Sequence, residues 1–499
     1  MENPTPTKMR QIRVGIHLDG FNSTENSAAT DMARTEEHSL FQSNLLSKCP
    51  AHLWPKESYR MACPRPILVT RHHREQIVKL SKALTVALSD IVSRWWSDKQ
   101  ARFFERMPLK LEEENLLKWL EDQVSVGRLK EYSACPGSWR PDFLIEDRVG
   151  CQGKVIAENF LITEINGRFP FNGAFHVAYG QEALDDTNLE CFGLASTTGS
   201  TQIFDGLRSL FNTNMPLHLL IGEEAGMDIH MLINASQERF GITPRLIKPS
   251  DLRLEADLQG SRGSRLCCLA RRKGDSKMFP SPTTFISSNG EIVEEIQQVG
   301  LELHQHELFA LPRDMLRQIS LCCFNDLRTV LLVHDKRMLS IVKQELQQLV
   351  LAQVLTPDEA RALDDGIVDT FIPGSPQLHS LLEESIHSPD LKGEYILKPI
   401  RSLFGEDLAP HEWKSALSSV QYQIPFKEKM FVVQKRVKHC LYDLVLHSSG
   451  EKLRYPLVGT WHIFQGKFCG LGVWRSSGDR ICAISSGGSM ICSVSRRLS

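Results

Sequence analysis

Two apolar segments carry polar side chains at alternating positions, and this pattern constrains the fold of the chain more than any other. The segment "SWRPDFLIE" contains Arg140 and Asp142, and "ENFLITEIN" contains Glu164 and Asn166. Successive side chains of a strand point to opposite faces, so the two members of each pair share a face. If the two strands pair, all four side chains are presented together. The alternative interpretation is an exposed Arg–Asp pair and a loop cap.

The length of the chain and its first third indicate several domains. A chain of 499 residues is too long for one hydrophobic core, so two or three folded domains are expected. Residues 1–60 are polar and show no periodicity, which predicts a flexible arm. Apolar residues recur at helical spacing between Arg71 and Asp98, and a second helical segment follows Pro108. Residues 61–135 are therefore expected to form a helical cap.

The remainder of the chain changes from an α/β pattern to an antiparallel β pattern. "PLHLLIG", "MDIHMLINASQERFG" and "TPRLIKPSDL" follow in strand–helix–strand order, which predicts an α/β domain over residues 136–320. Helical periodicity dominates from "EIVEEIQQVGLELHQHELFAL" to "LSIVKQELQQLVLAQ". The last segments, from "EYILKPI" to "ICAIS", alternate short strands with turns. The predicted fold class is α/β, with an α+β C-terminal part over residues 321–499.

Charge and cysteine spacing argue against several classes of protein. The net charge of −2 gives no overall field that would favour nucleic acid or a membrane surface. The thirteen cysteines include no CxxC pair, which argues against a zinc finger or a disulfide framework. The first residues are polar, and no apolar run reaches membrane-spanning length. We therefore expect a reduced, cytoplasmic protein without nucleic-acid or membrane partners.

The polar strand ends have the composition of a magnesium and phosphate site. Mg²⁺ prefers hard oxygen ligands, which Asp142, Glu164 and Asn166 can supply. A neighbouring arginine would neutralise a phosphate held by the metal. Lys398 ends the apolar strand "EYILKP", where it is a candidate phosphate ligand or a surface lysine. The backbone of the strand "MFVVQKRV" could read the edge of an adenine.

Taken in order, these segments resemble the ATP-grasp ligases of the glutathione synthetase and glutathionylspermidine synthetase type. That group has Arg-x-Asp and Glu-x-Asn on successive strands, then a lysine, a Lys-Pro strand, a hinge strand and a late glycine-rich sheet. The matching residues here are Arg140 and Asp142, Glu164 and Asn166, Lys336, Lys398 and Pro399, Val433, Gln434 and Lys435, and Arg475. The resemblance covers roughly residues 137–494, and residues 180–300 match only as generic α/β structure. It implies an ATP-grasp fold with residues 321–499 as the nucleotide-binding domain.

The resemblance also implies a reaction and a set of site residues. ATP-grasp ligases phosphorylate a carboxylate, and an amine then displaces phosphate from the acyl phosphate. The residues assigned by resemblance are Asp142, Glu164 and Asn166 for Mg²⁺, Lys336, Lys398, Val433, Gln434 and Lys435 for ATP, and Arg140 and Arg475 for catalysis. The implied function is an ATP- and Mg²⁺-dependent ligase that forms an amide on a small molecule or short peptide. Dimers are common in the group, so a homodimer is a further expectation.

The loop "GRFPFNG" after the second strand is a candidate for the substrate pocket. Arg168 could clamp a carboxylate, with Phe169 and Phe171 as walls and Asn172 as a second substrate ligand. The alternative is that both phenylalanines pack the loop onto the core.

One departure from the family pattern predicts weaker turnover. These ligases carry a glycine-rich loop over the phosphates, whereas "KPIRSLFGEDLAPHEW" contains only Gly405 and passes directly into a helical segment. Arg401 and Ser402 occupy the place of the metal-binding glutamate of glutathione synthetase. Because such a loop excludes water from an acyl phosphate, its loss should weaken catalysis. The alternative function is a nucleotide-binding or regulatory module that has lost turnover.

Overall fold

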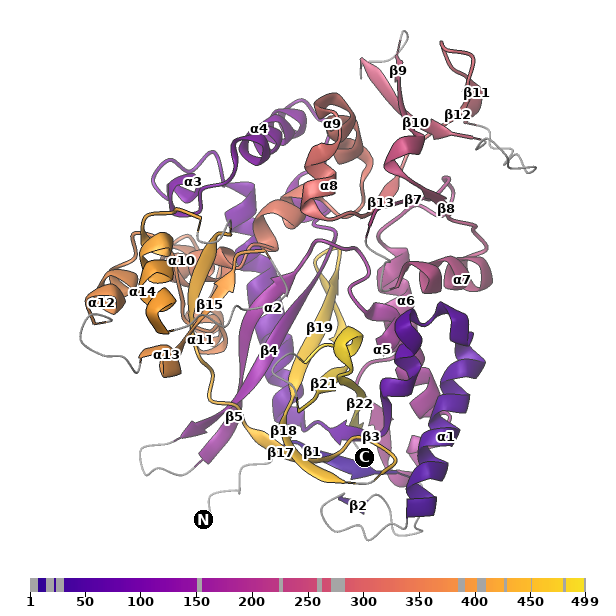
Figure 1. Ribbon diagram of the computed structural model, residues 1–499, viewed down its shortest axis with the longest axis vertical. Helices are drawn as coiled ribbons and strands as arrows, with labels where there is room; N and C mark the ends of the chain where they lie inside the picture. The colour runs from indigo at the N-terminus through magenta and orange to yellow at the C-terminus, as the bar shows by residue number, and fades with distance from the viewer. Residues whose placement is uncertain are drawn as a thin grey trace.

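The fold is organised around one large mixed sheet (Figure 1). The structure is a computed structural model that describes residues 8–14, 22–23, 31–149, 155–223, 228–257, 263–270, 283–384, 391–401, 410–425, 429–449, 451–478 and 482–497. The strands follow the order β2-β1-β3-β22-β21-β19-β4-β5, with β20 beside β19 and β6 beside β22. Their bounds are β1 Arg10–Arg13, β2 Asn22–Ser23, β3 Ala62–Leu68, β4 Ser138–Val149, β5 Val155–Asn166, β6 Leu194–Ser196, β19 Val458–Phe464, β20 Lys467–Leu471, β21 Trp474–Ser476 and β22 Ser489–Arg496.

Two apolar cores lie on the two sides of this sheet. Helix α2 (Arg71–Ser93) is capped by Thr70 and joins one core through an apolar stripe that packs with Phe143 and Trp461. The second core contains α5 (Ala174–Asp185), with α1 (Asp31–Lys48) and α6 (Ser200–Arg208) packed against α5. On β4 and β19, the positions that alternate with the α2-facing residues include the polar side chains of Arg140, Asp142, Thr460 and His462. These polar side chains form the candidate site.

The N-terminal part of the chain differs from its prediction. Residues 31–48, expected to belong to a flexible arm over residues 1–60, form α1, and Phe41 and Leu45 on this helix are buried. Residues 62–68, expected to begin a helical cap over residues 61–135, form β3 in the middle of the large sheet. The helices α3 (Phe103–Arg106) and α4 (Leu111–Ser125) follow α2. Tertiary packing of a few apolar residues therefore orders a segment whose sequence is mostly polar.

A smaller parallel sheet confirms the predicted strand–helix–strand order. Strands β7 (His218–Ile221) and β8 (Arg245–Ile247) are parallel and are joined through α7 (Ile229–Phe240), and β13 (Val299–Glu302) completes the order β13-β7-β8. A four-stranded antiparallel sheet extends from this layer at the upper right of Figure 1. Its strands are β9 Leu252–Ala256, β10 Ser264–Leu269, β11 Thr284–Ile286 and β12 Ile292–Glu295. The helical periodicity expected from residue 291 onward is therefore wrong for β12 and β13.

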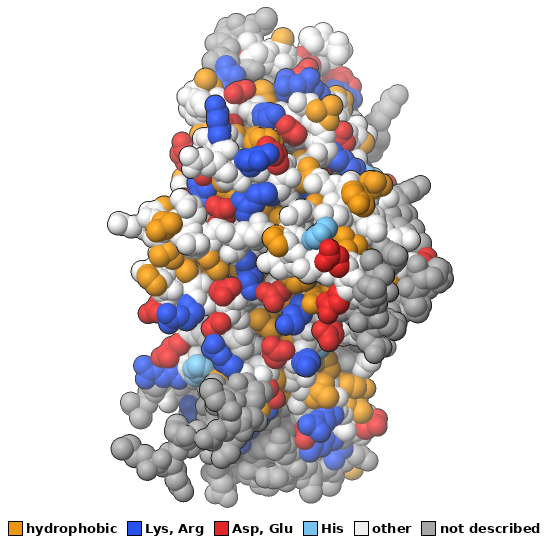
Figure 2. All heavy atoms as spheres, turned by 90° about the vertical axis from the view of Figure 1, so that its left-hand side faces the viewer, with side chains coloured by type: hydrophobic (Ala, Val, Ile, Leu, Met, Phe, Trp, Pro, Cys, Tyr) orange, Lys and Arg blue, Asp and Glu red, His pale blue; other side chains and the backbone are white. Residues whose placement is uncertain are grey.

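A fourth sheet has the order β14-β16-β15 and its own small core with two helices. It confirms the predicted strands "EYILKPI" and "MFVVQKRV". Figure 2 shows the side of the molecule that carries these helices, with Lys and Arg side chains interspersed among Asp and Glu. The bounds are β14 Thr370–Phe371, β15 Tyr395–Pro399, β16 Phe431–Lys435, α12 Pro376–Glu384, α13 Leu391–Glu394 and α14 Pro410–Gln421.

The remaining elements connect these sheets. They are helices α8 Gln305–Ala310, α9 Arg313–Cys322, α10 Arg337–Leu351 and α11 Pro357–Gly366, the hairpin β17 Leu441–Val445 and β18 Lys452–Pro456, a π-helical turn Thr329–Val333, and 3-10 turns Ala51–Leu53, Pro55–Met61, Tyr132–Ala134, Leu189–Phe192, Pro249–Asp251 and Ile484–Ser486. The large sheet takes strands from both sides of the boundaries expected at residues 135 and 320, so these boundaries do not separate independent sheets. Among the described helices, none has both the length and the apolar composition that crossing a membrane requires.

Candidate functional site

The register of β4 and β5 brings four of the predicted residues onto one face. Arg140 lies opposite Asn166, and Asp142 lies opposite Glu164, in an antiparallel pair. This register confirms the pairing expected from the alternating pattern. On its other edge β4 pairs with β19, where Thr460 lies opposite Asp142. A polar stripe therefore crosses three neighbouring strands.

Asp142 is buried and is bound by two arginines. Arg140 Nε donates to Oδ1 at 3.0 Å, Arg140 Nη2 donates to Oδ2 at 3.3 Å, and Arg475 Nη2 donates to Oδ2 at 2.5 Å. Burial alone would raise the pKa of Asp142, but the guanidinium charges of Arg140 and then Arg475 outweigh it and hold the pKa below its usual value. The carboxylate therefore fixes both predicted catalytic arginines at one point of the sheet.

Glu164 forms the second ion pair of the stripe. Lys336 Nζ lies 3.3 Å from Glu164 Oε2, and the lysine side chain is only 5% exposed. Lys336 stands immediately before α10, and the first backbone N–H groups of a helix carry partial positive charge. The N–H of Lys336 donates to the carbonyl oxygen of Ile400, two residues after Lys398. This bond holds the segments of the two predicted phosphate-binding lysines together.

Lys398 contributes a cation that has no hydrogen bond or ion pair within the part of the chain that the structure describes. It is partly exposed and comes from β15, opposite Val432 of β16. Packing around the ammonium lowers its pKa, an effect that Glu164 opposes and Lys336 reinforces. A cation in this position is suited to an incoming anion.

The oxygen donors of the stripe fit a magnesium ion in part. The Asn166 side chain is buried, and its Nδ2 has no hydrogen-bond partner among the described residues. A half-turn of this amide would present its oxygen instead. Glu164 uses Oε2 for Lys336, which leaves Oε1 for a metal. Both oxygens of Asp142 accept hydrogen bonds from arginines, so this carboxylate orients Arg140 and Arg475, and its role as a metal ligand stays a prediction.

The loop over residues 167–173 is tied to the stripe through its backbone. Arg140 Nη1 donates to the carbonyl oxygen of Asn172 at 2.6 Å, and Asn172 has a left-handed φ of 50°. Its Nδ2 donates to the carbonyl oxygen of Phe169 at 2.5 Å. The Nδ2 group of this amide therefore closes the loop on itself, and Asn172 stays a predicted substrate ligand.

Arg168 and the two phenylalanines divide between the surface and the core. The Arg168 guanidinium lies 5.0 Å from the centre of the Phe169 ring, and both residues are half-buried. Phe171 is 1% exposed and belongs to the second core, which confirms the packing alternative for this ring. Arg168 stays a predicted substrate ligand.

Three buried polar side chains, linked in series by hydrogen bonds, hold the end of this loop at Gly173. Gly173 N donates to Asp228 Oδ2, His176 Nδ1 lies 3.0 Å from Asp228 Oδ1, and Ser58 Oγ lies 3.0 Å from His176 Nε2. Hydrolytic triads use the same three residue types. Ser58 is only 5% exposed, so this chain positions the loop at the start of α5.

Arg401, which the resemblance places where glutathione synthetase has a metal-binding glutamate, is held by three contacts. Its guanidinium contacts Asp335 Oδ2 at 3.1 Å, Glu113 Oε1 at 2.5 Å and the carbonyl oxygen of Leu331 at 2.9 Å. Arg337 binds the same Asp335 at 2.8 Å. The short loop with Gly405 falls in residues 402–409, outside the described residues.

The predicted adenine hinge is the central strand of its sheet. Val433 pairs with Phe371 on one side and Leu397 on the other, and Gln434 is paired on both sides in the same way. Their backbone polar groups are therefore used within the sheet, which contradicts a backbone contact of Val433 or Gln434 with adenine. Lys435 is exposed at the end of β16 and stays a predicted ATP ligand.

Three polar residues of the site were missed by the sequence reasoning. Thr460 and His462 alternate along β19, and burial followed by the charge of Arg140 lowers the pKa of His462 to about 3. His334 Nδ1 lies 3.1 Å from the carbonyl oxygen of Ile165, and burial, then Arg168 and Lys336, lower its pKa to about 3. The alternation in "GTWHIF" was the available signal for the first two. His334, next to the motif "DKR", had none.

A groove of about 710 Å³ lies elsewhere, on the far part of α10. Its wall includes Asp98, Arg106, Glu345 and Gln348, and none of its lining residues belongs to the polar stripe. The convergence of charged groups, and not the volume of this groove, therefore locates the candidate site.

Three comparisons with known proteins bear on the family and the fold of the chain. The family model described as the AnkG N-terminal domain matches residues 80–332. The chain is 35% identical over 433 residues to the ATP-grasp enzyme ankG of Aspergillus thermomutatus, across 84% of this chain and 86% of that protein. The solved apo structure of GSS30, a glutathione synthetase-like effector from Globodera pallida, has 12% identity and a TM-score of 0.51 across 93% of this chain and 97% of that chain, which shows the fold alone. The predicted ATP-grasp fold is confirmed, and the chain belongs to the AnkG family of ATP-grasp enzymes.

Proposed function

We propose that this ATP-grasp enzyme joins a small-molecule or peptide carboxylate to an amine, using ATP and Mg²⁺, through an acyl phosphate. The observation that carries the proposal is the charge of the polar stripe. Four cations stand against two carboxylates, so positive charge is in excess by two. The residues are Arg140, Arg475, Lys336 and Lys398, with Asp142 and Glu164. This excess suits a polyanionic phosphate chain, whose binding would neutralise it.

The two lysines are placed to hold the phosphates of ATP. Lys398 has no anionic partner within the described ranges, and Lys336 forms an ion pair with Glu164. Lys336 also lies at the N-terminus of α10, where the backbone favours negative charge. Binding phosphate would therefore give Lys398 an anionic partner without breaking an ion pair of this residue within the described ranges.

Glu164 and Asn166 would hold the magnesium ion, each with one side-chain oxygen, and phosphate and water oxygens would complete its shell. When bound, Mg²⁺ supplies charge neutralisation and orientation of the transferred phosphate. The protein's own contribution is to keep both donors on one face of β5 at a fixed spacing.

The reaction needs positioning and charge stabilisation more than a protein nucleophile. A carboxylate oxygen of the substrate attacks the γ-phosphorus, and ADP leaves. The amine nitrogen of the second substrate then attacks the acyl carbon, loses a proton, and inorganic phosphate leaves. Arg140 and Arg475 stand beside each other on Asp142, where they would stabilise the negative charge on the transferred phosphoryl group. Arg475 Nε is buried without a hydrogen-bond partner among the described residues, so it keeps a donor for such an anion.

A nucleotide-binding module without turnover is the second candidate function. The observation that favours it is Arg401, which stands in place of a metal-binding glutamate and is tied to Asp335 and Glu113. A site with one metal ligand fewer would still bind a nucleotide but transfer phosphate slowly. For either function we propose a cytoplasmic location, no nucleic-acid or membrane partner, and a homodimer.

Calorimetric titration of ATP, with and without Mg²⁺, tests the proposal. We expect Glu164→Gln to weaken Mg²⁺-dependent binding about ten-fold or more, which corresponds to about 1.4 kcal/mol. Lys398→Met should weaken binding with and without the metal, because it removes a phosphate contact. Glu146→Gln is the matched control, since Glu146 lies on β4 but contacts Lys438 instead of the stripe. Equal affinity for the wild type and Glu164→Gln would remove the metal assignment.

ADP release then separates the two functions. A ligase should release ADP only when a carboxylate and an amine are both present, and an equimolar pool of amino acids and amines is a suitable first screen. ATP binding without ADP release from any pool would favour the module.

A further inference from the structure

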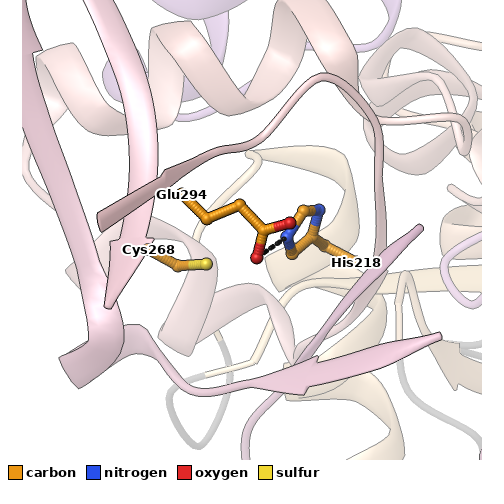
Figure 3. Close-up of side chains that lie close together, drawn as sticks. All are labelled: His218, Cys268 and Glu294. Carbon is orange, nitrogen blue, oxygen red and sulfur yellow. Dashed lines mark ion pairs between the residues drawn. The ribbon is translucent and has the colours of Figure 1, made fainter. Parts of the chain in front are cut away.

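A cluster of three buried side chains lies in the small sheets, outside the polar stripe (Figure 3). His218 comes from β7, Cys268 from β10 and Glu294 from β12. One potential ligand atom from each lies within 4.8 Å of the other two, and all three residues are buried. In Figure 3 the Glu294 carboxylate lies between the imidazole and the sulfur.

The topology of the two sheets brings these residues together. Cys268 lies directly opposite Glu294 in the antiparallel pair β10–β12, so their side chains share a face. His218 is the first residue of β7, the central strand of the neighbouring sheet. The cluster therefore joins the four-stranded sheet β9–β12 to the parallel sheet β13-β7-β8.

His218 provides a second, independent observation. It is 0% exposed, and neither of its ring nitrogens makes a hydrogen bond within the described ranges. Its ion-pair partner is Glu294 Oε2, which lies 3.5 Å from Nε2. Buried imidazoles are normally hydrogen-bonded, so an unsatisfied ring facing a carboxylate and a thiol points to a missing partner.

The spacing and chemistry of the donors match one class of ligand. Bond lengths of about 2.0–2.3 Å place the ligands of a tetrahedral zinc ion about 3.5 Å apart. The His218–Glu294 separation already has this value, and the cluster needs to contract by at most about 1.3 Å elsewhere. A thiolate, an imidazole and a carboxylate together favour zinc-like ions over Mg²⁺, which prefers oxygen ligands only.

We propose that His218, Cys268 and Glu294 bind a thiophilic divalent cation of the Zn²⁺ type that links the two small sheets. Binding takes the proton from the Cys268 thiol to solvent, and His218 binds as the neutral imidazole. A water molecule fills the fourth position. Arg245, which contacts Glu294 and the carbonyl oxygen of Leu269, then hydrogen-bonds the carboxylate from outside the metal.

Cobalt binding to the full-length protein tests this site, because a Co²⁺–thiolate bond gives a charge-transfer band in the near ultraviolet. The variants are Cys268→Ser and, as the matched control, Cys267→Ser. Cys267 is equally buried on the same strand, but it points to the opposite face. Co²⁺ held by oxygens at the polar stripe gives no such band, so the two sites are distinguished.

We expect one Co²⁺ per chain with this band in the wild type and in Cys267→Ser, displaced by equimolar Zn²⁺. Cys268→Ser should lose the band, and His218→Gln should weaken binding by about 100-fold or more, above the effect usual for residues outside the metal shell. The metal content after purification with Zn²⁺, measured by mass spectrometry, should fall in the same two variants.

A wild-type protein that gives no thiolate band and retains no zinc would overturn the proposal, and Arg245 would then be the cation that balances Glu294. Equal bands in Cys268→Ser and Cys267→Ser would overturn it as well. If Cys268→Ser does not fold, the band of the wild type and its weakening in His218→Gln decide the question.

Discussion

Asp142→Asn tests the central ion pair of the site. The substitution keeps the shape of the side chain but removes the charge that Arg140 and Arg475 share. Removing one partner of a buried pair costs about 3–5 kcal/mol. The two arginine side chains keep 14% and 12% of their surface exposed, so partial hydration of their charges favours the lower end, about 3 kcal/mol.

Urea unfolding followed by tryptophan fluorescence measures this loss. Trp139, Trp461 and Trp474 are buried in the sheet that carries the pair, so their emission reports on the unit that contains it. The matched control is Asp365→Asn. Asp365 contacts Arg148 of β4 at 2.7 Å but is 37% exposed, and it should cost less than about 1 kcal/mol.

A double-mutant cycle with Arg475→Met isolates the pairwise contribution. The coupling free energy between Asp142 and Arg475 should exceed about 1 kcal/mol, and a value below about 0.5 kcal/mol would refute the reasoning.

The pH dependence of the stability that Asp142 contributes has a defined sign. The pKa of Asp142 is lower in the folded state than the value of about 3.9 in the unfolded state, so its contribution is full above about pH 4 and is lost as pH falls further. Asp142→Asn should therefore be less sensitive to acid below this pH.

Two further predictions concern packing and protonation. In Gly459→Ala the new Cβ would lie 2.2 Å from Phe143 and 2.5 Å from Trp474. Urea unfolding should therefore show that the free energy of unfolding falls by about 1–3 kcal/mol. The control Gly393→Ala, whose Cβ meets open space, should change the free energy of unfolding by less than about 0.5 kcal/mol. Equal midpoints for the two variants would contradict this packing. The pKa of His334 is lowered to about 3 in the folded state. Between this value and the unfolded pKa of about 6.5, only the unfolded state binds the proton. The free energy of unfolding therefore falls with decreasing pH in this range, by up to about 1.4 kcal/mol per pH unit. His334→Gln should reduce this slope in urea titrations at pH 4.5 and 6.5, and an unchanged slope would show that His334 is not buried as a neutral ring.

The strands of the site could be predicted because alternation is a local signal. Arg140 and Asp142 alternate with buried residues on β4, and Glu164 and Asn166 do so on β5, so the shared face follows from the sequence alone. The partner of Asp142 across the sheet is different. Arg475 lies 333 positions away, and only the resemblance to a family connected the two. The role that failed, a backbone contact of Val433 and Gln434 with adenine, depends on which polar groups are already hydrogen-bonded, and a one-dimensional pattern does not contain this information.

The errors in the fold have a different cause. Helix α1 has few apolar residues, and its order comes from packing Phe41 and Leu45 against the second core. Strands β12 and β13 are four residues each, too short for the difference between a period of two and a period of 3.6 to be visible. Non-local contacts therefore decide both segments.

The hydrogen bonds and ion pairs of β16 and of the segment after β15 limit how far their sheet can move. Gln434 Nε2 donates to the carbonyl oxygen of Thr163 and to Thr370 Oγ1, both at 3.0 Å, and Arg401 anchors the segment after β15 to Glu113 and Asp335. Rotating the sheet β14-β16-β15 as a rigid body would break the buried hydrogen bond to Thr163, at about 0.5–1.5 kcal/mol, together with the buried charge pairs. The sheet β14-β16-β15 is therefore expected to keep its position relative to β5 of the large sheet. Helices α12 and α14 share their small core with Leu397, Phe431 and Val433 of this sheet, so any motion of the helices is expected to be coupled to the sheet.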